Sequence, residues 1–68
     1  MKIVKVLDRA KENNQMRHDS DLAKALGVHR SAITRYRNGC HRPKPDVLRK
    51  LAELSQLDLS TVLLASIN

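Results

Sequence analysis

Apolar side chains recur along this chain at intervals of three and four residues, the spacing that gathers them on one face of an α-helix. No segment shows the sustained alternation of apolar and polar residues that is typical of a half-buried strand. Turn-forming residues interrupt the pattern at Asn13-Asn14, at both glycines and at both prolines, and there is a weaker break over 55–58. These interruptions predict five short helices, over about 2–12, 19–26, 30–38, from 45 to the break, and from about 58 onward.

The predicted helices carry recognisable end signals. Gly27 ends the second helix as a left-handed cap, and Gly39 ends the third. Pro45 suits the first position of the fourth helix, where a missing N–H group costs nothing. Asp58 is the predicted N-cap of the fifth helix, with Leu57 and Val62 placed for a hydrophobic staple across it. The apolar stripes predict a core from Ile3, Val6, Leu7, Ala10, Leu22, Ala23, Leu26, Ile33, Tyr36, Leu48, Leu51, Ala52, Leu54, Val62, Leu63 and Ile67.

The third predicted helix has an unusually narrow apolar edge. Only Ile33 and Tyr36 are sizeable apolar residues within 30–38, and hydrogen-bond donors occupy the other faces. The link from the second helix is too short for a long antiparallel hairpin, so it predicts the steep crossing of a helix-turn-helix. Such a donor-rich helix fits the DNA major groove, where arginine donates twice to guanine and serine contacts several base edges. The predicted base-reading residues are Arg30, Ser31 and Arg35.

The segment DLAKALGVHRSAITRYRNG resembles the helix-turn-helix of the phage repressor and Cro family, also called the XRE family. Ala23 matches a close approach of two helices, Gly27 matches the turn, and Asn38-Gly39 matches the end of the recognition helix. Val28, Ile33 and Tyr36 match the buried positions. The tail PDVLRKLAELSQLDLSTVLL resembles the fourth and fifth helices of the family, so the likeness covers roughly 16–66. It implies a single lambda-repressor-like DNA-binding domain over 1–68, an all-α compact five-helix bundle with its helix-turn-helix at about 19–38.

The resemblance also implies residue roles. It supports the three base-reading residues and adds Thr34 as a weaker one. Residues at the ends of the recognition helix and in the following loop correspond to DNA phosphate contacts, and His29 also takes the place of a capping residue. Family members often carry glutamine at the start of the second helix, where this chain has Asp19, whose carboxylate would repel phosphate; it would instead orient Arg30 or Arg17, or accept from cytosine. The implied phosphate contacts are His29, Arg37, Asn38, Arg42 and Lys44.

Composition narrows the class of protein further. A chain of 68 residues makes one domain, and its net charge of +6 favours a polyanionic partner. The core must be aliphatic, because Tyr36 is the only aromatic residue. A single cysteine allows no internal disulfide, which fits the cytoplasm, and no apolar run approaches the roughly 20 residues of a membrane span. Cys40 and the three histidines match no zinc-binding spacing and no catalytic arrangement, so neither a metal, another cofactor nor an enzyme is predicted.

These observations predict a sequence-specific transcriptional regulator, a small Cro-like phage or prophage repressor that binds a palindromic operator in double-stranded DNA as a homodimer. Leu64 and Ile67, near the end of a helix with surplus apolar residues, are the predicted dimer contacts, although they could instead close a small core. No ligand pocket and no small-molecule ligand are expected. The alternative is a protein-binding module on the same scaffold, such as an inhibitor or antitoxin-like protein that docks on an acidic partner.

Overall fold

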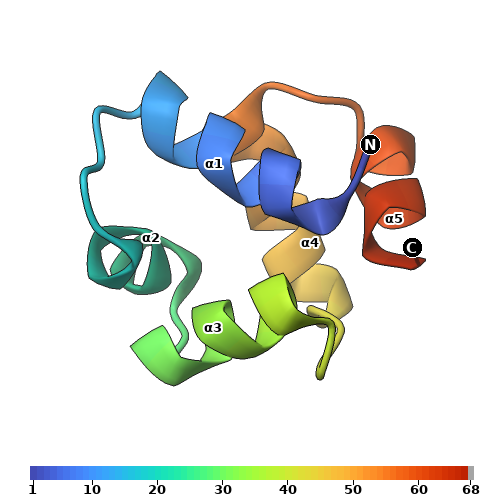
Figure 1. Ribbon diagram of the computed structural model, residues 1–68. Coiled ribbons are helices and arrows are strands. Elements are labelled where there is room, and N and C mark those ends of the chain that lie inside the picture. Colours follow the sequence, from blue (N-terminus) through green and yellow to red (C-terminus); the bar gives the residue numbers. More distant parts are fainter. Residues whose placement is uncertain (68) are drawn as a thin grey trace.

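The computed structural model describes residues 1–67, and within them it contains five α-helices and no strand (Figure 1). They are α1 (Ile3–Asn13), α2 (Asp19–Leu26), α3 (Arg30–Asn38), α4 (Pro45–Ser55) and α5 (Leu59–Ile67). The predicted all-α fold is therefore confirmed, and each predicted helix is present with starts that differ by at most one residue. No helix among these residues has both the length and the apolar character needed to cross a membrane.

The helix ends follow from the residues that occupy them. Gly27 and Gly39 adopt left-handed conformations, with φ of 72° and 76°, and their N–H groups bond carbonyls in the preceding turn of helix. Pro45 is the first residue of α4, as predicted. Gln56 ends α4 with φ of 57°, a left-handed conformation that favours glycine and that the sequence did not predict.

The core lies where α1 crosses α4 and where the pair α2 and α3 closes over them (Figure 1). Its fully buried hydrophobic side chains are aliphatic, as the composition required, and the one buried polar side chain among the described residues is Ser55, whose hydroxyl donates to the Leu51 carbonyl. Most predicted core positions are buried, and Val47 joins them. The prediction was wrong for Leu63 and Ile67, which are 42% and 60% exposed. Helix α5 packs on the core through Val62 and Ala65 instead. This helix is apolar on several sides, so the sequence pattern did not single out the face that is buried.

Side chains from the end of α1 fix it to the end of α4. The Nε–H of Arg9 and the Nδ2–H of Asn13 both donate to the backbone carbonyl of Ser55, at 3.0 and 2.9 Å. The Nδ2–H of Asn14 donates to the carbonyl of Leu54 at 2.9 Å. The last carbonyls of a helix lack partners within it, so these contacts satisfy groups that would otherwise need water. The α1–α4 pair is thus a fixed frame on which α2 and α3 are mounted.

Candidate nucleic-acid interface

Helix α3 has one covered side and one open side. Ile33 and Tyr36 are 0% and 7% exposed, and they pack the helix onto the core. The residues on the other side are all exposed, and at about 100° per residue they fall within a continuous arc of about 140°. We call this arc the open face, and it consists of Arg30, Ser31, Thr34, Arg35 and Asn38.

The guanidinium groups of Arg30 and Arg35 have no partner among the described residues. The ion pairs found within 1–67 involve Lys11 and Arg37 as their cations. Asp19 and Asp21, the acidic residues nearest to Arg30 in sequence, are engaged elsewhere. Asp46, the nearest to Arg35, forms no ion pair with it. The open face therefore presents two exposed guanidinium groups that form no ion pair within the described residues.

The N-terminal end of the open face is ordered by His29. Its Nδ1 accepts from the backbone N–H of Ser31 at 3.1 Å and lies 2.9 Å from the Ser31 hydroxyl oxygen. The predicted capping role of His29 is therefore confirmed. Because Nδ1 is engaged with Ser31, Nε2 is the ring nitrogen that remains for a contact outside the protein.

Arg37 lies at the edge of the covered side and is held by two carboxylates. Its Nε–H and Nη2–H donate to Asp19 at 3.0 and 2.9 Å, and Nη2 also lies 2.8 Å from Asp8. Lys11 donates to the same Asp19 at 3.0 Å. The hydrogen bonds from Arg37 have the largest effect and lower the pKa of Asp19; burial opposes them, the hydrogen bond from Lys11 adds to the lowering, and the resulting pKa is about 2. The same contact with Asp19 raises the pKa of Arg37.

This network changes two of the roles inferred from the sequence. Asp19 does not orient Arg30 or Arg17, because its two oxygens are occupied by Arg37 and Lys11. Arg37 was expected to contact phosphate, but its guanidinium group joins α3 to α1 and α2 and its side chain is only 22% exposed. Its geometry is that of a residue that holds the recognition helix in place.

The loop after α3 presents its charges outward. Arg42 and Lys44 are exposed on either side of Pro43, which is buried and fixes the loop to the body of the protein. Cys40 is exposed and forms no disulfide. Within the described residues, no cluster of His, Cys, Asp or Glu side chains could hold a metal ion.

Comparison with known proteins agrees with this geometry. A family model described as helix-turn-helix matches residues 2–62, which is most of the chain. The chain belongs to the XRE-type helix-turn-helix family. Searches of curated proteins and of solved structures gave no significant match. Membership in this family supports a DNA-binding regulator rather than an enzyme.

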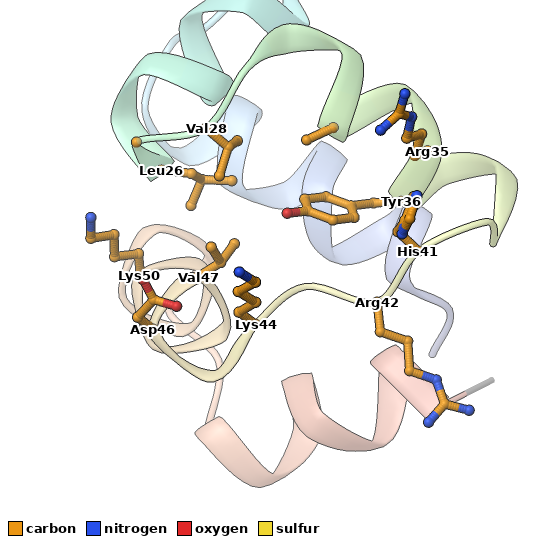
Figure 2. A pocket seen from close by; sticks show the side chains of 12 residues that line it. Leu26, Val28, Arg35, Tyr36, His41, Arg42, Lys44, Asp46, Val47 and Lys50 are labelled. Carbon is orange, nitrogen blue, oxygen red and sulfur yellow. The ribbon is translucent and has the colours of Figure 1, made fainter.

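This helix-turn-helix domain also has a surface hollow that the sequence did not indicate. It measures about 420 Å³ and lies between the turn that joins α2 to α3, the loop after α3 and the start of α4 (Figure 2). Tyr36, predicted to be a core residue, forms part of its wall. Burial and then the charge of Asp46 raise the pKa of the Tyr36 hydroxyl.

Sequence reasoning missed two groups of residues around this site. The first is Asp8 and Lys11, whose partners lie on other helices. The second is Lys50 and Asp46, which line the hollow from α4. Asp46 occupies the acidic first turn of a helix, and Lys50 sits on a polar face, so each had an ordinary explanation in the sequence and no signal set either apart.

Proposed function

We propose that this helix-turn-helix protein is a small Cro-like repressor, of phage or prophage origin, that reads a palindromic DNA operator as a homodimer in the bacterial cytoplasm. The observation that carries the proposal is the open face of α3. A nine-residue helix that buries only two large side chains and leaves Arg30 and Arg35 without partners has a surface suited to reading base edges.

The base-reading residues in this proposal are those at the start and middle of the open face. Arg30 and Arg35 each supply the paired donors that match the O6 and N7 acceptors of guanine. Ser31 and Thr34 lie between them with exposed hydroxyl groups that suit several base edges. The hydroxyl of Ser31 is already oriented by His29, which favours a fixed contact over an adaptable one.

Phosphate contacts come from the two ends of α3 and the loop. His29 and Asn38 are exposed at the two ends of the helix, and Arg42 and Lys44 are exposed beyond it. Contacts of this type position a protein on the duplex and supply affinity without sequence information. Arg37 is excluded from this set because Asp8 and Asp19 occupy its guanidinium group.

The homodimer is supported by α5 and by the size of the molecule. Leu64 and Ile67 are 65% and 60% exposed, beside the less exposed Leu59 and Leu63, which makes an apolar surface at the C-terminal end of the described chain. The Cα atoms extend over only 24 × 24 × 18 Å. Successive major grooves on one side of DNA lie about 34 Å apart, so reading two half-sites requires two copies.

The test is selection of bound duplexes from a random pool at physiological salt. We expect two inverted half-sites, each containing guanine, with centres about 10 base pairs apart. A selected motif without inverted symmetry would contradict the homodimer. Failure to enrich any motif, with an acidic protein bound instead, would favour the protein-binding module.

A further inference from the structure

The hollow beside the recognition helix has an apolar floor and a cationic rim. Leu26 and Val47 are 2% and 4% exposed and line its base, together with the half-buried Val28. Lys44, the residue before α4, and Lys50, within α4, extend toward the α2–α3 turn (Figure 2). Asp46 is the only acidic residue among those that line the hollow. The combination favours a ligand that has both negative charge and apolar C–H surface.

Lys50 has a defined place in this arrangement. It is exposed, and a Cβ atom built on Gly27 would lie 3.5 Å from its Nζ atom, so the ammonium group reaches from α4 to the turn of the helix-turn-helix. No carboxylate among residues 1–67 forms an ion pair with it. Its charge is therefore available to a ligand, at the far end of the hollow from Arg42 (Figure 2).

The hollow is continuous with the proposed DNA-binding surface. Arg35 belongs to both, and Arg42 and Lys44 connect the hollow to the loop of proposed phosphate contacts. When the open face lies in a major groove, the sugar–phosphate strands that border the groove pass over the surfaces beside α3. This position favours the DNA backbone as the occupant of the hollow, because deoxyribose supplies apolar surface and phosphate supplies negative charge.

We propose that the hollow seats one sugar–phosphate step of the bound DNA, and that Lys50 contacts its phosphate as a residue in addition to those of the loop. The proposal rests on the proposed function. It also gives Asp46 a role, because a carboxylate in the same hollow opposes the phosphate and limits affinity that carries no sequence information. The Tyr36 hydroxyl, turned toward Lys44 and Val47, is a neutral donor for the same group (Figure 2).

The experiment measures binding by fluorescence anisotropy over a salt series, on a selected duplex and on a shuffled one. For Lys50→Gln we expect weaker binding to both duplexes, with the slope of log K against log salt reduced by about 0.9 and the ratio between duplexes unchanged. Asp46→Asn should change affinity in the opposite direction. The matched control is Lys5→Gln, an exposed lysine of α1 that does not line the hollow, and it should leave the slope unchanged.

A second arm locates the contact. Neutral methylphosphonate linkages are placed one at a time along the selected duplex. We expect the methylphosphonate at one position to weaken binding of the wild type but to have little further effect on Lys50→Gln. The contact is already lost in that variant, so removing the charge of its phosphate partner removes nothing more. Far-ultraviolet circular dichroism verifies that each variant is folded.

Two outcomes would overturn the proposal: a Lys50→Gln salt slope equal to that of Lys5→Gln, or a loss of sequence preference in Lys50→Gln, which would make Lys50 a base contact. Neither result affects the proposed function, which depends on the preference of the wild type for the selected duplex. Conversely, a wild type without that preference refutes the operator-binding function, while the shuffled duplex still measures the Lys50 contact.

Discussion

Helix α3 places the same residue type in two different environments. Arg37 is bound by Asp8 and Asp19 and is largely covered, whereas Arg30 and Arg35 are exposed with no partner among the described residues. The first holds the helix to α1 and α2, whereas the proposed function assigns the other two to a bound partner. The difference teaches that the function of an arginine on a recognition helix depends on the helices behind it as much as on its own position.

The largest expected effect comes from the open face. In the double variant Arg30→Ala/Arg35→Ala, we expect preference for the selected operator to be lost. Each guanine contact contributes about 1–3 kcal/mol of discrimination, so preference should fall by about 5- to 150-fold for each arginine. The measurement is the ratio of Kd values for the operator and a shuffled duplex. Melting temperature should not change, since neither side chain has a partner in the fold; an unaltered Kd ratio in a folded variant would contradict the assignment.

The next effect concerns the proposed homodimer. Replacing Leu64 and Ile67 by glutamate should abolish self-association on DNA, because two charges would then lie in an apolar contact. We expect operator affinity to fall at least about tenfold while the single half-site is bound as before. Analytical ultracentrifugation with and without operator tests this. Retained dimer formation would place the interface elsewhere, and Ser60→Glu, on an exposed position at the start of α5, is the matched control.

On the covered side, Arg37→Met should destabilise the fold rather than change base preference. It removes charged hydrogen bonds that are partly exposed, so we expect a loss of about 1–2 kcal/mol in the free energy of unfolding. Urea denaturation gives this value directly, with Arg35→Met as the matched variant that should cost little. Equal destabilisation by the two variants would erase the distinction between the two sides of α3.

The pH dependence of the covered side is an effect of similar size. The pKa of Asp19 is lowered in the folded protein, so its carboxylate stabilises the fold at pH values above about 4 and this contribution is lost as the pH falls toward 2. The loss should be roughly 1–2 kcal/mol, reduced from what the shift implies because the side chain is 28% exposed. Thermal melting of Asp19→Asn should decline less between pH 5 and pH 2 than that of the wild type. Parallel declines would show that the ion pair is not formed in solution.

The sequence predicted the parts of this fold that depend on local signals. Apolar spacing and the caps at Gly27, Gly39 and Pro45 were sufficient for the helices, because each acts within one or two turns. The buried face of α5 was not predictable in the same way, since Leu63 and Ile67 continue an apolar pattern that has no single side. The fixing of α1 to the end of α4 was missed because Asn13 and Asn14 look like turn residues, and their carbonyl partners lie some 40 residues away.

The candidate site also has a part that local signals predicted and a part that depends on long-range packing. The open face could be read from spacing alone, because exposure on a short helix follows from which positions are apolar. The partners of Arg37 could not, since they depend on how α1 and α2 are placed. Its position four residues after Ile33 was the available signal, because it sets Arg37 at the border of the buried side. Lys50 required the packing of α4 against the turn, which no local pattern encodes.

The most direct test of the account pairs one arginine with one base atom. Each guanine of the selected operator is replaced in turn by 7-deazaguanine, which lacks the N7 acceptor, and Kd is measured for the wild type, Arg30→Ala and Arg35→Ala. We predict that the wild type is weakened at two distinct guanines in each half-site and that each variant is insensitive at one of them. If both variants remain as sensitive as the wild type at every guanine, the open face of α3 does not read DNA.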